Sequence, residues 1–504
     1  GVPLSAQSDA DGVVELDGLC PGTLRVSVTQ LDHAAVVRRL VLGEGIVHDR
    51  IELPALHEHH ARVIVVHDEG HGEPAASDAV SGAALRRVRG RPLADAVAGI
   101  GGVAVLRSPA GGMGKPIIRG QVGRRNLILV DGIRHESQQW GLDHPPEVDP
   151  NGAGRITVIK GAATTRYGQR ASGGVVLLDS LPLLRSPGVT GEVGTFGSTN
   201  AAGGGGNARV DYAPARVRGL AMRAEGNFAL HRAALAPDYA LSNTGSRTGN
   251  GGVRIGYLRD RLDIDVGYRV FRTRLGICDC LNVSSPEEFG TRIGARRPPG
   301  LALARARFAI ARPEQRVTHH LALARARVAV AKAGELHALY AFQLDDRREY
   351  ERVRSSVSGP QLRLWLATHT AEAHFEHRSV PLGAWSLEGI GGVALGQQRN
   401  RIVSLDTLVP DYGQWSWGAY QVERFVHERA ELELGARYDG VHRRADLRER
   451  DYLGQRATGG LDEAHCRARG DGGVCVHDFH APSATIAALV RPFAKVPELS
   501  WALK

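Results

Sequence analysis

The residues best suited to chemistry lie in one polar segment, residues 134–149. It places imidazole and carboxylate side chains within a few positions of one another, at His135, Glu136, Asp143, His144 and Glu147. Imidazole nitrogens and carboxylate oxygens are common ligands of zinc and similar divalent ions. The segment therefore predicts a metal-binding loop. The alternative is that its Asp and His side chains only cap turns and bond to neighbouring elements.

Other candidate ligands are weaker. Cys278-Asp279-Cys280 lies in a polar stretch, but a single C-x-C pair is too common to predict a metal site. His319 and His320 are adjacent, so in a strand they face opposite sides and make poor joint ligands. The tract Leu56-His57-Glu58-His59-His60 reads as a solvated linker rather than a metal-collecting tract.

Catalytic motifs do not emerge from the sequence. It contains neither G-x-S-x-G nor H-E-x-x-H, and the stretch Gly111-Gly112-Met113-Gly114 lacks the Lys-Ser/Thr ending of a phosphate-binding loop. We therefore expect a protein that is not an enzyme.

Five cysteines are present, and two of them, Cys466 and Cys475, lie in one polar loop at a spacing that closes easily. A disulfide between them is predicted, which fits an oxidising compartment.

Composition narrows the class of protein. The 504 residues include 63 Gly and 24 Pro, with 42% hydrophobic and 23% charged residues, which suits an ordered chain. No run of about 18 to 20 apolar residues occurs, which excludes a helical membrane protein. The net charge of +9 comes from interspersed charges (Lys+Arg 63, Asp+Glu 54), so nucleic acid is not an expected partner.

Residues 78–185 carry four short motifs in a fixed order after a helical stretch at residues 92–97. They are Ile118-Arg119-Gly120 with Arg125, Val130-Asp131-Gly132-Ile133, Arg155-Ile156-Thr157-Val158-Ile159-Lys160-Gly161, and Tyr167-Gly168 leading to Gly173-Gly174-Val175-Val176. β-Branched runs favour short buried strands, and Gly permits positive φ or close approach. The order of these motifs resembles the plug domain of TonB-dependent receptors, which implies an α+β fold.

From residue 186 onward, apolar and polar residues alternate. Ala322, Ala324, Ala326, Val328 and Val330 oppose Arg325 and Arg327, and Leu432, Leu434, Ala436 and Tyr438 oppose Glu433, Arg437 and Asp439. A soluble β-sandwich with one solvated face allows the same pattern. The plug resemblance favours a transmembrane antiparallel β-barrel with an apolar exterior and a wet interior.

The predicted fold is therefore mainly β, in four parts. Residues 1–55 resemble part of a carboxypeptidase regulatory-like β-sandwich through D-A-D-G-x-x-x-L-x-G-L-x-P-G; residues 56–77 form the linker, 78–185 the plug and 186–504 the barrel. Within the linker, Val63, Ile64, Val65 and Val66 look like a TonB box, although one more strand of the sandwich is an equal alternative.

The barrel region is short for the family. Its 319 residues, from 186 to 504, suffice for about 12 to 14 strands, whereas the family's barrels have 22. The chain begins without a signal peptide and ends without a terminal aromatic residue. We expect an incomplete barrel, whose open edges would prevent stable insertion into lipid.

The resemblance implies transport across the cell outer membrane. The expected partners are outer-membrane lipid, the TonB protein with its ExbB/ExbD motor, and a cargo of zinc or an iron siderophore; the barrel is expected to be a monomer without a resident cofactor. Arg119-Gly120-Gln121-Val122-Gly123-Arg124-Arg125 followed by Asp143-His144 is similar to zinc-importing members, in which an Asp-His pair binds the ion. The alternatives are a signalling or glycan receptor and a nonfunctional truncated fragment.

Overall fold

The computed structural model describes the backbone of residues 22–28, 36–42 and 501–503, and residues 77–107, 114–138, 144–160, 164–184, 186–259, 261–278, 285–297, 305–351, 358–404, 409–427 and 429–490. The chain divides into two units, residues 1–62 and 63–504. The TonB-box-like residues Val63–Val66 and the predicted metal ligand Asp143 lie outside the described residues.

The first unit shows one antiparallel strand pair. Strand β1 (Gly22–Val28) pairs with β2 (Val36–Leu42), with Arg25 opposite Arg39. Within residues 1–55 the structure describes this strand pair, so the regulatory-like sandwich stays a prediction.

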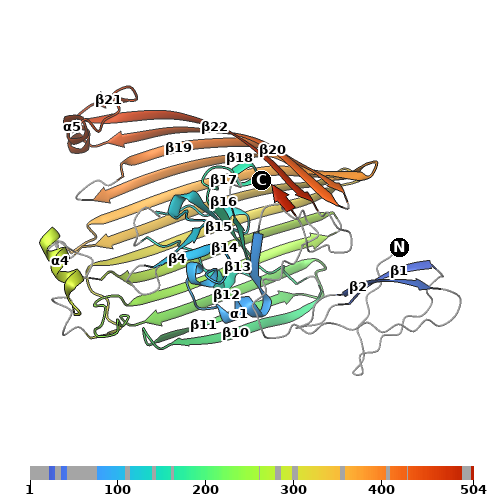
Figure 1. The fold of residues 1–504 in the computed structure, drawn as a ribbon, viewed down its shortest axis with the longest axis horizontal. Helices are drawn as coiled ribbons and strands as arrows, with labels where there is room; N and C mark the ends of the chain where they lie inside the picture. The colour runs from blue at the N-terminus through green and yellow to red at the C-terminus, as the bar shows by residue number, and fades with distance from the viewer. Residues whose placement is uncertain are drawn as a thin grey trace. The chain divides into compact units, whose positions relative to one another are not determined.

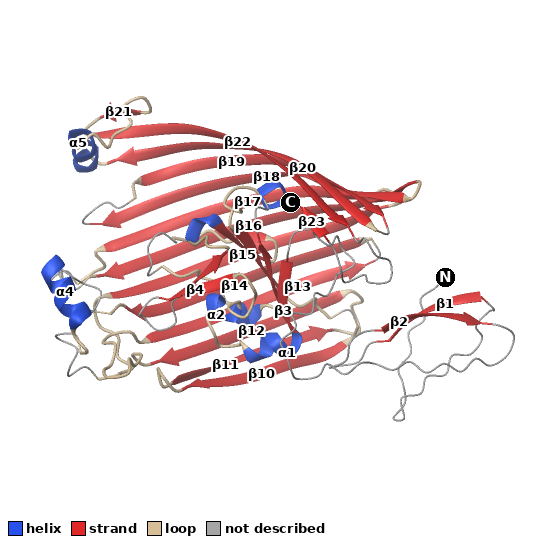
Figure 2. Ribbon diagram, viewed as in Figure 1, coloured by secondary structure: helices blue, strands red, loops and turns tan. Residues whose placement is uncertain are grey.

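The second unit is dominated by a large sheet of 14 strands, within the predicted range (Figures 1 and 2). Neighbours follow the sequence from β10 to β20; β22 then pairs with β20, and β21 and β23 pair with β22, all antiparallel. The strands are β10 (Gly188–Ser198), β11 (Gly203–Ala213), β12 (Leu220–His231), β13 (Ser246–Arg259), β14 (Leu262–Gly276), β15 (Glu314–Val330), β16 (Gly334–Tyr350), β17 (Leu362–Leu382), β18 (Trp385–Ser404), β19 (Asp411–His427), β20 (Ala430–Leu447), β21 (Cys466–Arg469), β22 (Gly472–Val490) and β23 (Trp501–Leu503).

The alternation along these strands separates two faces. On β14, the side chains of Val266 and Tyr268 are exposed at 53% and 42%, whereas Asp265 between them is buried. On β20, Leu434 and Tyr438 are exposed, and Arg437 and Asp439 are buried. An apolar outer face and a polar inner face are typical of a barrel wall that crosses a lipid bilayer.

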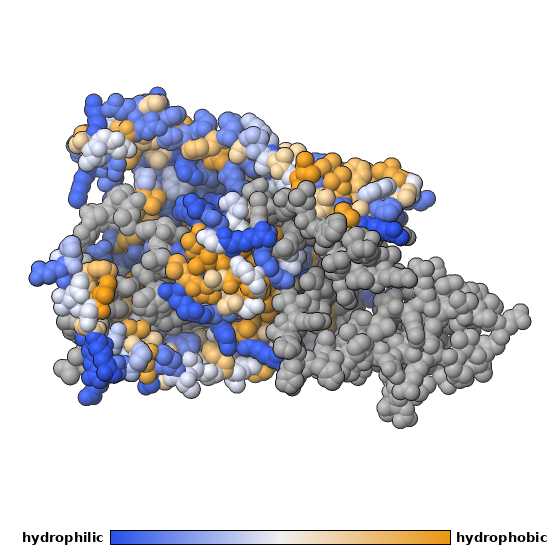
Figure 3. Space-filling view, in the orientation of Figure 1, coloured by the Kyte–Doolittle hydropathy of each residue, from blue (hydrophilic) through white to orange (hydrophobic). Residues whose placement is uncertain are grey.

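The two ends of the sheet differ. At one end the strands join through short turns, such as residues 331–333 between β15 and β16. At the other end longer connections carry α4 (Pro286–Gly294) and α5 (Glu449–Ala457), and hydrophilic side chains gather there at the left of Figure 3. Outer-membrane barrels have short periplasmic turns and long outward loops, so the end with α4 and α5 is the outward end.

Two cysteine predictions can be compared with these outward connections. The predicted disulfide joins Cys466 to Cys475, next to the β21–β22 turn. Cys278 is also disulfide-bonded, so its thiolate is not free to bind a soft metal.

The inner domain, residues 77–184, lies on the polar face of the large sheet. Its central sheet has the order β3-β8-β9-β6-β7, in which β6 and β9 are parallel. The strands are β3 (Ser77–Ser81), β6 (Asn126–Val130), β7 (Ile133–Arg134), β8 (Arg155–Lys160) and β9 (Gly174–Asp179), with a separate hairpin of β4 (Val103–Arg107) and β5 (Gly114–Ile118). Short helices flank them: α1 (Gly82–Arg87), α2 (Leu93–Ala96), which confirms the helical stretch predicted at residues 92–97, and α3 (Thr164–Tyr167).

One hydrophobic core joins the inner domain to the large sheet. It combines inner-domain residues such as Ile118, Ile156 and Val176 with Leu321 and Leu323 of β15. Burial of these side chains stabilises the contact by about 25 cal/mol per Å² of apolar area removed from water. The inner domain is therefore held against β15 and β16 by packing as well as by polar contacts.

Among the described residues, no helix is long and apolar enough to span a membrane.

Candidate functional site

A tight turn between β6 and β7 positions the first polar cluster. Val130 pairs with Ile133, which leaves Asp131 and Gly132 as a two-residue loop with φ of 52° and 81°. Positive φ at both central positions defines a type I′ hairpin turn, for which Asp-Gly is a preferred sequence. The sequence Val130-Asp131-Gly132-Ile133 is thus explained locally by its turn.

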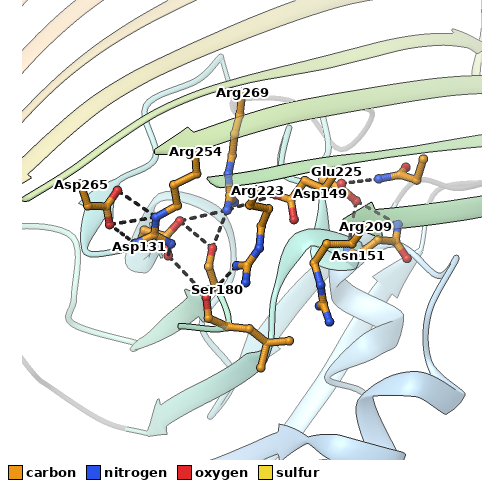
Figure 4. Close-up of polar contacts among 12 residues, drawn as sticks. Asp131, Asp149, Asn151, Ser180, Arg209, Arg223, Glu225, Arg254, Asp265 and Arg269 are labelled. Carbon is orange, nitrogen blue, oxygen red and sulfur yellow. Dashed lines mark hydrogen bonds and ion pairs between the residues drawn. The ribbon is translucent and has the colours of Figure 1, made fainter. Parts of the chain in front are cut away.

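The carboxylate of Asp131 joins the inner domain to the large sheet (Figure 4). Within the inner domain, it accepts hydrogen bonds of 2.9 Å from the backbone N–H and from the hydroxyl of Ser180. From the sheet, Arg269 lies at 3.1 Å and Arg254 at 3.8 Å, and Arg325 donates to the Asp131 carbonyl at 3.1 Å. Asp131 is 4% exposed, so these contacts are little screened by solvent.

Neighbouring contacts in Figure 4 extend the same interface. Asn227 of β12 donates to Asp149, which also accepts the backbone N–H of Asn151 at 3.0 Å. Arg223 donates at 2.7 Å both to Asp211 and to the carbonyl of Leu181. Burial raises the pKa of Asp149, although the hydrogen bonds from Asn151 and Asn227 oppose this shift.

The segment containing the predicted ligands lies against the outward half of β16. Gln343 accepts from the Glu136 backbone N–H at 3.1 Å and donates to the Arg134 carbonyl at 2.9 Å. Asp345 accepts the backbone N–H of Gln138 at 3.2 Å. Alternate residues on the inner face of one strand therefore bind consecutive parts of the segment, as the two-residue period of a strand requires.

Two predicted ligands face charged partners. His144 Nε2 lies 2.9 Å from Glu349 Oε1 at the end of β16, and burial lowers the pKa of His144 despite this hydrogen bond. Glu136 accepts a hydrogen bond of 2.8 Å from Arg170. Burial disfavours its charge, but Arg170 and Arg134 outweigh burial and lower the pKa of Glu136.

His135 and Glu147 lie together with a residue of the sheet, His319 on β15. The rings of His135 and His319 stack with centroids 4.5 Å apart, and His319 Nδ1 lies 3.5 Å from Glu147 Oε2. Burial and the neighbouring His319 lower the pKa of His135 to about 3, so it is neutral at physiological pH. A neutral imidazole keeps a nitrogen lone pair that can bind a metal ion.

Arg347 on β16 links these two pairs. Its guanidinium is fully buried, donates to Glu147 and to Gln315 (2.7 Å), and lies 3.6 Å from Glu349. Burial disfavours the charge of Glu147, but Arg347 outweighs it and holds the pKa of Glu147 below its usual range.

Comparison with known proteins agrees with this architecture. Residues 71–175 match the family model described as the TonB-dependent Receptor Plug Domain. Solved structures that match include the copper transporter OprC (16% identity, TM-score 0.57, covering 82% of this chain and 61% of that chain) and the hemophore receptor HasR of Serratia marcescens with its hemophore HasA and heme (14%, 0.60, 83% and 61%). The ferric citrate transporter FecA also matches (12%, 0.57, 84% and 61%). No curated protein sequence matches.

The chain has the fold of a TonB-dependent outer-membrane receptor. The inner domain is its plug, and the large sheet is its barrel sheet. The chain spans about 61% of the length of the first three structures named above. Identities of 12% to 16% carry the fold alone, so cargo and partners belong to the proposals below.

In this fold, the sequence-predicted site residues fall into three groups. His144 reaches Glu349, His135 and Glu147 join His319, and Glu136 is held by Arg170. Their role as metal ligands stays a prediction, as does that of Asp143. Sequence reasoning considered His319 only together with His320, and missed it as a partner of the plug. The one available signal was its position on the polar face of an alternating strand.

Proposed function

We propose that this receptor imports a metal ion or metal chelate across the outer membrane in a TonB-dependent step. The observation that carries the proposal is the contact between His144 of the plug and Glu349 at the outward end of β16. Imidazole and carboxylate groups suit zinc and similar divalent ions. The similar structures support a metal-containing cargo, since they include a copper transporter, a hemophore receptor in complex with its hemophore and heme, and a ferric citrate transporter.

Within this proposal, zinc binding uses Asp143 and His144, with Glu349 as a third ligand from the barrel sheet. Glu349 Oε1 already contacts His144 Nε2 at 2.9 Å, so an ion that enters between them replaces a hydrogen bond with two metal–ligand bonds. The plug residues and the barrel residue would then be linked through the cargo, which gives cargo binding a direct effect on the plug.

Zinc binding tests this site. The Asp143→Ala/His144→Ala variant should bind Zn²⁺ at least about 10-fold more weakly than the natural protein in a titration of the purified full chain, because it loses two ligands. His320→Ala is a matched control, since His320 lies on the other face of β15, where it hydrogen-bonds to Tyr268 of β14. Unchanged zinc affinity in the double variant would remove the zinc hypothesis; a parallel titration with ferric citrate then tests a chelate cargo.

We further propose that Val63–Val66 bind TonB by adding a strand to its sheet. These residues lie just before the plug match begins at residue 71, and a β-branched run favours the extended backbone that strand addition needs. Main-chain hydrogen bonds supply the affinity in this mode of recognition.

Val65→Pro tests the TonB proposal, because proline lacks the backbone N–H and cannot complete a ladder. Binding of the purified TonB periplasmic domain should weaken by about 1–3 kcal/mol, or roughly 5- to 150-fold, while Zn²⁺ affinity stays unchanged. Val65→Ile keeps the N–H and the β-branched side chain and should bind TonB normally. Equal TonB binding by the proline variant would show that this segment is not the TonB box.

A further inference from the structure

Three side chains at the plug–barrel interface form a cluster with the chemistry of a metal site. His135 and Glu147 come from the plug, and His319 comes from β15, more than 170 positions further along the chain. One ligand atom from each lies within 4.8 Å of the other two. The cluster thus joins two parts of the receptor that the polypeptide connects only distantly.

Four polar atoms of this cluster are buried and make no hydrogen bond. His319 and Glu147 are each 3% exposed, and His135 is 9% exposed. Both ring nitrogens of His319, Nε2 of His135 and Oε2 of Glu147 make no hydrogen bond. A buried polar group left unpaired costs about 1–3 kcal/mol, so four in one place need a physical reason.

The charged groups around the cluster indicate what kind of ligand it would bind. Glu147 gives one oxygen to Arg347, and its Oε2 remains on the side of His319. The carboxylate of Asp345 lies next to Glu147 and also has an unpaired buried oxygen, Oδ1. Glu147 and Glu349 both contact the one guanidinium of Arg347. The unpaired imidazole nitrogens and carboxylate oxygen of the cluster together favour a cation.

We propose that His135, Glu147 and His319 bind a divalent transition-metal ion of the zinc class and thereby join the plug to the barrel wall. Two imidazoles and one carboxylate are the ligand set of zinc sites that keep a fourth position for water. Ligand atoms in such a site are about 3.3 Å apart, given metal–ligand distances near 2.0–2.1 Å. The ligand atoms now lie within 4.8 Å of one another, and an ion would draw them closer and turn the two stacked rings so that their nitrogens face it.

The fourth position has space beside it. The three residues line a cavity of about 60 Å³ between the plug and the inner face of β11–β15, together with Asn207, Asn227 and Arg269. This volume accommodates several water molecules, which a bound ion and its exchange require. An ion at this site would therefore have room for a water ligand in its fourth position.

This site is separate from the proposed cargo site. His144 and Glu349 contact each other, and Arg347 lies between them and Glu147. An ion held by His135, Glu147 and His319 would oppose displacement of the plug, because moving the plug breaks bonds to His319. The inference does not depend on which cargo the receptor imports.

Cobalt titration tests the site, since Co²⁺ adopts zinc-like coordination and absorbs visible light when bound. The metal-free full chain should bind Co²⁺ with visible absorption. His319→Gln should lower Co²⁺ affinity by at least about 10- to 100-fold, the range seen when even an outer-shell partner is removed. A second readout is thermal: Zn²⁺ should raise the melting temperature of the natural protein by more than that of His319→Gln, which keeps only the cargo site.

His320→Gln is the matched control, because it changes the adjacent histidine on the opposite face of the same strand. It should bind Co²⁺ normally. His144→Gln should lose only binding at the proposed cargo site and keep the binding that depends on His319. Loss of Co²⁺ binding in His144→Gln with retention in His319→Gln would overturn the proposal and place the ion at the cargo site. Absence of Co²⁺ binding and of zinc-dependent stabilisation in the natural protein would also overturn it. Neither result bears on TonB binding, which is measured separately.

Discussion

Replacing Asp131 with Ala should detach the β6–β7 hairpin from the barrel sheet and destabilise the plug by about 3–5 kcal/mol, as expected when one partner of a buried ion pair is removed. The substitution removes the carboxylate that lies beside Arg254 and Arg269 of the barrel sheet, whereas the hydrogen bond from Arg325 to the backbone carbonyl of residue 131 remains. It also removes both hydrogen bonds to Ser180, which hold β9 to this turn.

Asp131→Asn removes the negative charge but keeps the backbone turn, so it distinguishes the two contributions. Asn tolerates positive φ almost as well as Asp, so the backbone at φ 52° is preserved, and the amide oxygen still accepts the Ser180 N–H. The expected loss is smaller, about 1.5–3 kcal/mol for charged hydrogen bonds. Hydrogen exchange of the β6 and β9 amides in the purified receptor measures both effects. Equal protection in Asp131→Ala and the natural protein would show that packing alone seats the plug.

The faces of the barrel strands could be predicted from sequence because strand alternation is a local property. Arg325 was expected on the polar face, and the structure brings it to within 2.6 Å of the buried Asp265 on β14. The same reasoning predicted exposed Val328 and Val330, which are 37% and 40% exposed. No knowledge of distant contacts is needed for this result.

The plug motifs were also predictable, because glycine restrictions act on the local backbone. Gly168 has φ +79°, and a Cβ there would lie 2.9 Å from guanidinium nitrogens of both Arg134 and Arg437. Gly174 faces the carbonyl of Ile159, only 2.6 Å from an added Cβ. These positions cannot hold larger residues without strain, so the motif is visible in the sequence itself.

The composition of the candidate site was less predictable, because it depends on which strand faces the plug. Gln343, Asp345 and Glu349 lie about 200 positions after the segment they contact. Local patterns carry no information on this register. For the same reason His319 could not be joined to His135 from the sequence. The contact of Glu136 with Arg170 lies within the plug, but it spans too many positions for a local pattern to predict it.

Arg347 is the second position at which a large effect is expected. Its fully buried guanidinium is held by Glu147, Gln315 and Glu349, so Arg347→Met leaves the buried Glu147 and the partly buried Glu349 without the cation that they share. The expected loss is about 3–5 kcal/mol in the free energy of unfolding. Glu147→Gln should also destabilise, but less, since Glu349 still compensates the guanidinium.

A double-mutant cycle decides whether these two residues act as one unit. The variant Glu147→Gln/Arg347→Met removes both charges together, so no charge of the pair is left uncompensated. Its loss should fall short of the sum of the two single losses by about 0.5–3 kcal/mol, the range for residues in direct contact. Denaturant unfolding with chelator present measures the cycle without any contribution from metal. Additive losses would mean that Arg347 is stabilised mainly by Glu349 and Gln315, and that Glu147 carries its charge for another partner, such as the ion proposed between His135 and His319.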